Sequence, residues 1–242
     1  MRLNCDLGES FGPWRMGMDE AVMPHIDMAN VACGFHASDP VTMQHTVALA
    51  KTHGVTIGAH PGYPDLVGFG RRSMVCTPEE IGAFVTYQVG ALVAIAAAQN
   101  AEVVYVKPHG ALYNDMMAHE HIFVAIANAI SAYDKRLKLM ILSSAKNPRY
   151  EELATPLGIE LLYEVFADRE YTDEGFLVSR AKKGAVIHCT DAVKVRIDLL
   201  DKEGKLVTET GKVIALKADA LCVHGDNQKA LDLIVSLREY LG

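Results

Sequence analysis

Short apolar runs alternate with stretches of helical periodicity along the whole chain. This alternation is typical of βαβ units, in which helices connect the parallel strands of one sheet. Several of the runs are apolar at every position, as expected of strands that are covered on both faces. The predicted strands are residues 2–5, 27–32, 55–59, 103–107, 137–142, 160–166, 185–188 and 220–223.

Local signals mark where the predicted helices begin and end. Asp39 precedes Pro40, which places a capping carboxylate before a proline at the first helical position, and Gly54 ends that helix. Thr77 and Glu80 have the spacing of a capping box, which predicts the start of a long amphipathic helix. The pattern therefore predicts both the helices and their limits.

One segment interrupts the alternation. Residues 195–216 contain short β-like stretches with turn signals at 202–204 and 210–211, which predict an antiparallel excursion before the final strand. The last helix is expected to begin at Asp226. We interpret residues 1–242 as one α/β domain, a TIM-like (β/α) barrel that is distorted or seven-stranded. An open doubly wound sheet is the alternative that the pattern leaves open.

Length and charge agree with this interpretation and exclude some functions. The 242 residues leave room for about eight strand–helix units of ~30 residues each. With 23 Lys and Arg against 30 Asp and Glu, the formal charge is −7. Basic residues gather in no more than local pairs, such as Arg71–Arg72 and Lys182–Lys183, so binding to nucleic acid through phosphate contacts is not expected.

The amino-terminal residues turn polar at once, so we expect no signal peptide, and no apolar run approaches the ~18 residues of a membrane span. Five scattered cysteines without a CxxC pair disfavour a disulfide framework and a structural zinc site. We expect a cytoplasmic protein with no nucleic-acid or membrane partner.

Polar, turn-forming residues follow nearly every predicted strand. Because the carboxyl ends of barrel strands form one rim, these residues are expected to share a single site. Four of the ten histidines, His36, His60, His109 and His224, lie at such ends. The runs are residues 5–10, 33–39, 59–65, 107–110, 166–170 and 223–227.

Two chemistries remain open for this rim. Asp6, His36 and His60 follow three successive strands and could hold one divalent metal. Without a metal, Asp6 would serve as a general acid or base and the histidines as hydrogen-bond donors to a substrate. Arg71 and Arg72 lie on a glycine-rich loop that either carries cations toward an anionic group or is a solvated surface loop. The chain has no Walker motif and no dinucleotide fingerprint.

At these strand ends the sequence resembles the LamB/YcsF family, which includes the A subunit of the bacterial ATP-dependent 5-oxoprolinase. The resemblance extends over nearly the whole chain, in the order of the family's motifs. One departure is Ser38, where the family pattern has glycine, and we expect its consequences to be local. The matching segments are residues 4–12, 29–36, 58–65, 68–72, 106–114, 166–169 and 222–227.

The resemblance implies a TIM-like barrel related to glycoside hydrolase and deacetylase barrels. It also implies opening of 5-oxo-L-proline to L-glutamate with ATP hydrolysis, with ATP and Mg²⁺ as co-substrate and subunits B and C as partners. Two alternatives remain open: a stand-alone, metal-dependent amide or N-acetyl hydrolase, and a non-catalytic subunit that binds the lactam.

Within that resemblance we assign roles as a hypothesis. Asp6 would activate water or orient a metal, Lys107 and His109 would stabilise developing charge, and Glu9 would position these groups. Arginines would hold the substrate carboxylate or a phosphate. The predicted substrate-binding residues are Asn4, His36, His60, Arg71, Arg72, Asp168, Arg169, His224 and Asp226.

Overall fold

Seven of the eight predicted strands close into a parallel barrel in the order β1-β2-β3-β4-β5-β6-β9. The computed structural model describes residues 1–179, 182–187, 189–225 and 227–241. The prediction of a TIM-like, seven-stranded α/β barrel is therefore confirmed, and the open-sheet alternative is wrong. The strands are β1 Arg2–Leu7, β2 Met28–Ala32, β3 Thr56–His60, β4 Val103–Val106, β5 Lys138–Leu142, β6 Leu161–Phe166 and β9 Ala220–Val223.

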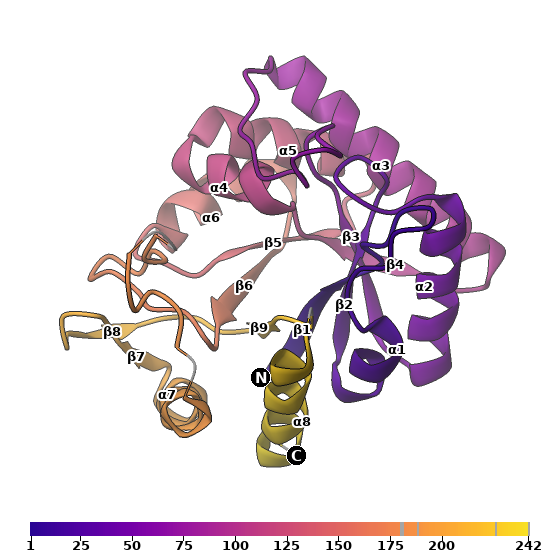
Figure 1. The fold of residues 1–242 in the computed structure, drawn as a ribbon. Coiled ribbons are helices and arrows are strands. Elements are labelled where there is room, and N and C mark those ends of the chain that lie inside the picture. Colours follow the sequence, from indigo (N-terminus) through magenta and orange to yellow (C-terminus); the bar gives the residue numbers. More distant parts are fainter. Residues whose placement is uncertain (180–181, 188, 226, 242) are drawn as a thin grey trace.

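Helices surround the barrel (Figure 1), and α3 packs against both α2 and α5. An antiparallel hairpin of β7 (Lys205–Val207) and β8 (Val213–Ala215) packs beside α7. The α-helices are α1 Asp19–Val22, α2 Pro40–His53, α3 Pro78–Ala98, α4 Gly110–Ala118, α5 Glu120–Tyr133, α6 Asn147–Ala154, α7 Thr190–Glu203 and α8 Gln228–Leu241, and the 3-10 helices are η1 Met23–His25 and η2 Thr155–Leu157.

The capping signals predicted from the sequence are confirmed. The Asp39 carboxylate accepts hydrogen bonds from the backbone N–H groups of Val41 and Thr42, and Gly54 ends α2 in the left-handed conformation. Thr77 and Glu80 form both hydrogen bonds of the capping box at the start of α3. These helix limits were readable because each depends on residues close in sequence.

Two predictions about the last third of the chain were wrong. Residues 185–187 are not a barrel strand: Val186 forms an isolated antiparallel bridge with Arg169, within the connection from β6 to α7. His188, the last residue of that prediction, lies outside the described residues. The run is short and follows Gly184, whose φ of +87° turns the chain away from an extended path.

The predicted excursion at 195–216 is antiparallel only in its second half. Residues 195–203 belong to α7, in which Val193, Ile197 and Leu200 bury one helical face. Gly204 is the left-handed cap of that helix and not part of a hairpin turn. The expected start of the last helix, Asp226, lies outside the described residues, and α8 runs from Gln228.

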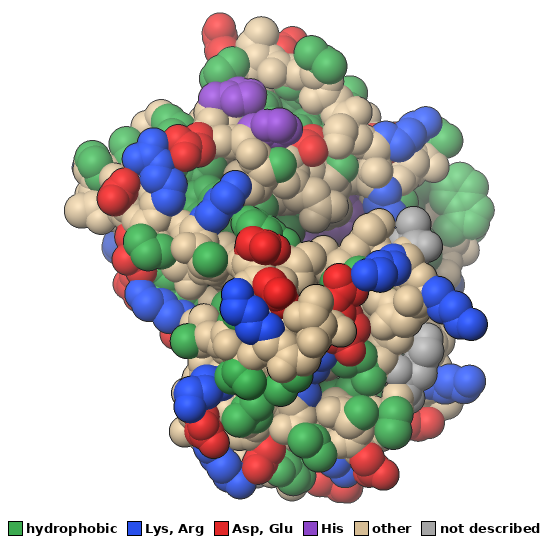
Figure 2. Space-filling view, turned by 90° about the vertical axis from the view of Figure 1, so that its left-hand side faces the viewer, with side chains coloured by type: hydrophobic (Ala, Val, Ile, Leu, Met, Phe, Trp, Pro, Cys, Tyr) green, Lys and Arg blue, Asp and Glu red, His purple; other side chains and the backbone are tan. Residues whose placement is uncertain are grey.

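Charges of both signs are interspersed on the face shown in Figure 2. The basic pairs noted in the sequence are offset by acidic neighbours, because Arg72 pairs with Asp65 and Lys182 pairs with Glu209. Within the described residues α3 is long and apolar enough to cross a membrane, but core helices of soluble proteins pass the same test and this one packs against α2 and α5.

The barrel interior has an apolar lower layer. Met28, Tyr105, Met140, Leu162 and Ala220 come from five strands and form a cluster separate from the larger core between strands and helices. The Tyr105 ring lies against Gly58, where a Cβ atom would come within 2.2 Å of the ring. A glycine is therefore required at that position of β3.

Polar residues occupy the next layer toward the carboxyl ends of the strands. Asn4, Asn30, Lys107 and Glu164 are buried there. The Lys107 Nζ lies 2.7 Å from Glu164 Oε1 and 3.0 Å from Asp6 Oδ1, and the Tyr113 hydroxyl donates to Glu164 Oε2. An ammonium and a carboxylate buried together are tolerated because each offsets the desolvation of the other.

This ion pair predicts the stability of three variants. Lys107→Met should lower the free energy of unfolding by about 3–5 kcal/mol, because it leaves Glu164 charged and unpaired in the interior. In the double variant with Glu164→Gln, the combined loss should be about 2 kcal/mol smaller than the sum of the single losses. Urea denaturation measures all three.

The matched control for this ion pair is Lys138→Met, which breaks an exposed pair with Glu160, the residue just before β6. It should change the free energy of unfolding by less than about 1 kcal/mol. Equal losses in Lys107→Met and Lys138→Met would contradict a structural role for the buried pair.

The backbone conformation at Ser38 shows why the family pattern has glycine at this position. It is fully buried with φ +78°, a left-handed conformation that glycine adopts without strain. Its hydroxyl makes one long hydrogen bond, of 3.4 Å, to the carbonyl of Asp39. The glycine expected there suits this backbone better than serine does.

We therefore predict that Ser38→Gly stabilises the protein by about 1 kcal/mol, which raises the melting temperature by about 2–4 °C. Ser38→Ala is the control, since it removes the hydroxyl and keeps the strained backbone, and it should give no gain. A melting temperature that falls in Ser38→Gly would refute the strain at this position.

Candidate active site

A cavity of about 450 Å³ opens at the carboxyl ends of the barrel strands. Loops after β3, β4 and β6 form its walls, so residues far apart in sequence meet there. This supports the expectation that the strand-end residues share one site. The predicted site residues that line the cavity are Asp6, His60, Arg71, Lys107, His109, Arg169 and His224.

Asp6 is the penultimate residue of β1, and its side chain is 29% exposed. Its Oδ1 accepts hydrogen bonds from Asn30 Nδ2 at 2.8 Å and Lys107 Nζ at 3.0 Å, and its Oδ2 lies 3.4 Å from His60 Nε2. Burial alone would raise the pKa of Asp6, but the neighbouring His60 and the Lys107 ammonium hold it well below its ordinary value. Asp6 is therefore a fixed negative charge at the cavity.

The Lys107 ammonium is fully engaged beneath Asp6. Besides the two carboxylates, its Nζ lies 3.3 Å from Asn4 Oδ1 and 3.5 Å from Cys222 Sγ. Burial would lower its pKa, but Asp6, Cys222 and Glu164 raise that pKa well above the ordinary value. Lys107 thus holds Asp6 in place, and its predicted role in stabilising developing charge stays a prediction.

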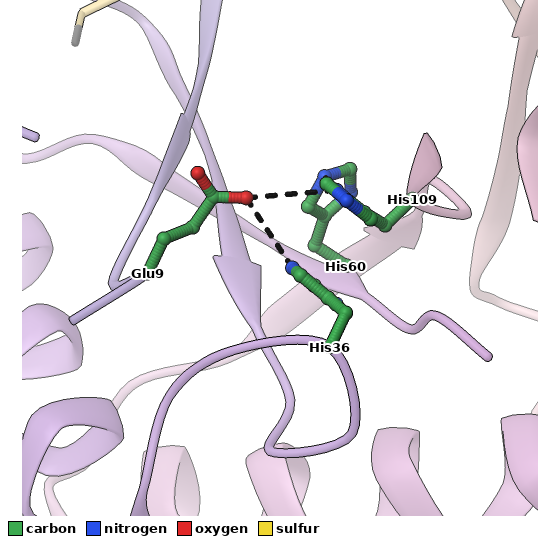
Figure 3. Close-up of side chains that lie close together, drawn as sticks. All are labelled: Glu9, His36, His60 and His109. Carbon is green, nitrogen blue, oxygen red and sulfur yellow. Dashed lines mark hydrogen bonds and ion pairs between the residues drawn. The ribbon is translucent and has the colours of Figure 1, made fainter. Parts of the chain in front are cut away.

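Three histidines, His36, His60 and His109, lie close to Glu9 (Figure 3). The His36 Nε2 lies 3.3 Å and the His109 Nδ1 3.5 Å from Glu9 Oε1. The His60 Nε2 lies 3.0 Å from His109 Nδ1. The rings of His36 and His109 stack with centroids 3.6 Å apart, whereas His60 is nearly perpendicular to both.

Burial sets the charge state of this cluster. It lowers the pKa of His109 to about 2, with further contributions from His36 and His60. Burial also lowers the pKa of His36 well below its ordinary value and raises that of Glu9, which faces the charge of Asp6. His36 and His109 are therefore neutral near physiological pH, the form in which a histidine binds metals.

A glycine allows the loop after β3 to close over these rings. Gly70 has φ +61°, and a Cβ atom there would lie 2.7 Å from the Cβ of His36 and 2.8 Å from Cδ2 of His109. The preceding residue, Phe69, accepts a hydrogen bond from His109 Nε2 through its carbonyl oxygen. The loop thus helps to fix the orientation of the His109 ring.

The adjacent arginines of this loop have different positions. Arg72 is held by the Asp65 carboxylate on the outside of the loop, and it does not line the cavity. Arg71 lines the cavity, where its guanidinium carbon lies 5.5 Å from the centroid of the Phe69 ring. Within the described part of the chain, Arg71 forms no ion pair.

On the opposite wall, His224 Nδ1 lies 3.3 Å from Asp168 Oδ2. Burial opposes ionisation of Asp168, but its hydrogen bond to His224 lowers its pKa below the ordinary value. Arg169 donates to the backbone carbonyls of Val178 and Ala185, which orders the connection between β6 and α7. Asp168 thus orients His224, and Arg169 supports the cavity wall.

Among the described residues, the other predicted site residues do not line the cavity. Asn4 is buried in the polar layer below, and Glu9 and His36 stand behind His109. Asp226 lies outside the described residues. The predicted metal set also changes, because the ligand atoms that lie within 4.8 Å of one another belong to Glu9, His36, His60 and His109, and Asp6 is not among them.

The buried residues that bond to Lys107 and Asp6 beneath the cavity were not predicted from the sequence. Glu164 is fully buried between Lys107 and Tyr113, and Asn30 bridges Asn4 and Asp6. A single signal could have revealed Glu164, since it is the one charged residue in the apolar strand β6 and a buried carboxylate requires a partner. The chemistry of the assembled site is that of a small polar cavity with a fixed anion, three imidazoles and one accessible guanidinium.

Comparison with known proteins agrees with this geometry. The profile of the LamB/YcsF family matches residues 1–242. A protein of Vibrio campbellii that is named as the A subunit of 5-oxoprolinase is 50% identical over 241 residues, which cover 100% of this chain and 95% of that protein. One of Pseudomonas putida, named as a second 5-oxoprolinase A subunit, is 51% identical over 239 residues, covering 99% of this chain and 93% of that protein.

Solved structures support the same assignment. The lactam utilization protein of Thermus thermophilus superposes with a TM-score of 0.93 at 41% identity, covering 100% of this chain and 95% of that one. A putative cellobiose-phosphate cleavage protein of Enterococcus faecalis, at 10% identity and a TM-score of 0.57, covers 99% and 93% and shares the fold alone. From its matched length, its identity to curated relatives and its barrel, this chain belongs to the LamB/YcsF family.

Proposed function

We propose that this chain is the A subunit of an ATP-dependent 5-oxoprolinase, which opens 5-oxo-L-proline to L-glutamate together with subunits B and C. The full-length identity to proteins of that name supports the proposal. The observation in the structure that carries it is the Asp6 carboxylate, held ionised by His60 and Lys107 at the mouth of a small polar cavity. Such a site suits the hydrolysis of a small, charged amide.

The cavity matches the charge of the lactam. 5-Oxo-L-proline is a compact anion, and the Arg71 guanidinium at the cavity wall can bind its carboxylate with two parallel hydrogen bonds. His224 faces the same space, with its side chain 28% exposed, and can donate to the ring oxygen. Arg71 replaces Arg72 in this role, because Asp65 already neutralises Arg72.

ATP would overcome the low reactivity of the five-membered lactam. Transfer of the γ-phosphoryl group to the lactam oxygen makes the ring carbon electrophilic and releases ADP. Water then adds to that carbon, the ring C–N bond breaks, and phosphate leaves as glutamate forms. Asp6 would accept a hydrogen bond from this water and orient it, and Lys107 acts through Asp6 as a positioning residue.

The residues of this cavity fit the lactam better than a triphosphate. Of the cations that line it, Lys107 is paired with two carboxylates and Arg169 is bonded to backbone carbonyls, which leaves Arg71. The sequence also lacks a phosphate-binding loop. We therefore propose that ATP and its Mg²⁺ are bound mainly by subunits B and C, in a cytoplasmic complex without nucleic-acid or membrane partners.

A reconstitution assay tests the proposed activity. Glutamate release from 5-oxoproline and ATP should require this chain and both partner subunits together, and each part alone should be inactive. Hydrolysis of 5-oxoproline or of acetylated sugars by this chain alone, with added metal and without ATP, would instead establish the stand-alone hydrolase.

A substitution at Asp6 separates a catalytic subunit from one that only binds the lactam. Asp6→Asn keeps the size of the side chain and removes its charge, so kcat of the reconstituted complex should fall about 100-fold or more. Asp232→Asn, on the exposed face of α8, is the matched control and should leave kcat unchanged. If Asp6→Asn raises KM and spares kcat, the chain is a lactam-binding subunit.

A further inference from the structure

The hydrogen bonds of two histidines fix where their lone pairs point. His60 Nδ1 lies 2.7 Å from the carbonyl oxygen of Lys107, and His109 Nε2 lies 2.9 Å from that of Phe69. A carbonyl oxygen accepts only, so each of these nitrogens carries a hydrogen. In the neutral rings the other nitrogens, His60 Nε2 and His109 Nδ1, are unprotonated, and they face each other at 3.0 Å.

Two carboxylates point at the same place. Asp6 Oδ2 lies 3.4 Å from His60 Nε2, and Glu9 Oε1 lies 3.5 Å from His109 Nδ1. With no proton or ion between them all four atoms are acceptors, and acceptors brought together in a buried site repel one another. The cluster therefore requires either a shared proton or a metal ion.

A metal fits this cluster better than a proton. The two inward ring nitrogens and Glu9 Oε1 offer three donor atoms close together, whereas a proton bridges only two of them. A metal ion needs neutral rings. A backbone carbonyl bonded to the far nitrogen of each ring is also the usual arrangement behind metal-binding histidines, because it fixes tautomer and ring orientation.

The spacing supports three ligands. Ligand atoms about 2.0–2.1 Å from a tetrahedral ion lie about 3.3 Å apart. The observed separations are 3.0 Å between the two ring nitrogens and 3.5 Å between His109 Nδ1 and Glu9 Oε1. His36 is excluded as a ligand in this arrangement, because its ring is parallel to His109 at 3.6 Å and one ion cannot lie in both ring planes.

We propose that Glu9, His60 and His109 bind one divalent transition-metal ion of the Zn²⁺ or Co²⁺ class. His60 and His109 line the cavity, so the fourth position of the ion faces it and is open to water or to a carbonyl oxygen of a ligand. His36 stacks on His109 and contacts Glu9, and it acts as a positioning residue. The proposal does not depend on the 5-oxoprolinase assignment.

Titration with Co²⁺ tests this site in the full-length chain, after treatment with EDTA and dialysis, without ATP or partner subunits. Visible absorption reports tetrahedral coordination, and calorimetry with Zn²⁺ gives the affinity. One ion should bind per chain. His60→Asn and His109→Gln each keep the amide N–H that donates to the backbone carbonyl and remove the inward nitrogen, so each should weaken binding about 100-fold or more.

Two controls accompany these variants. The double variant His119→Gln, His121→Gln removes the exposed pair of rings at the start of α5 and should bind metal unchanged, which excludes adventitious surface binding. His36→Gln should weaken binding about 10-fold at most, as for a residue behind the ligands. Thermal melts of all variants establish that they are folded.

Absence of saturable binding at one ion per chain would overturn the proposal and indicate a proton shared between His60 and His109. Binding that is lost with His119 and His121 would also overturn it, and loss in His36→Gln equal to that in His60→Asn would refute the three-ligand set. Because glutamate release is assayed separately in the reconstituted complex, failure of metal binding and failure of the proposed function are distinguishable.

Discussion

The Lys107 ammonium, buried beneath the mouth of the barrel, determines the arrangement of the site. An unpaired ammonium at this depth would be prohibitively desolvated, so Lys107 draws Asp6 from β1 and Glu164 from β6 to within 3.0 Å. The three side chains connect strands on different sides of the barrel. Together with His60, this pairing keeps Asp6 ionised at the cavity, where its charge is available to a substrate.

A second constraint acts on the histidines beside it. Backbone carbonyls take the outward N–H of His60 and of His109, and this leaves their lone pairs facing each other and two carboxylates. The barrel thus places the Asp6 carboxylate next to the proposed metal ligands Glu9, His60 and His109 at one rim. A site of this kind combines groups for orienting water with groups for binding a metal, and Arg71 supplies the complementary charge for an anionic ligand.

Much of this could be predicted from the sequence, for identifiable reasons. Helix caps such as Asp39 depend on neighbours in sequence. The strand ends of a parallel barrel meet at one rim, so the sequence predicts that Asp6, His60 and His224 lie at one site. The sequence could not show that Asp65 holds Arg72 outside the cavity, since that contact depends on how a loop folds. Nor could it pair Glu164 with Lys107, since strand alternation gives a side chain's direction but not its partner.

Carbon-13 NMR of the aspartate carboxyl groups, with Asp6 assigned by comparison with an Asp6→Asn sample, tests most directly whether its neighbours His60 and Lys107 keep this carboxylate charged. The Asp6 signal should keep the shift of an ionised carboxylate throughout a titration from about pH 8 down to about pH 4, where ordinary aspartates begin to protonate. A signal that titrates at or above the usual aspartate range would contradict the account.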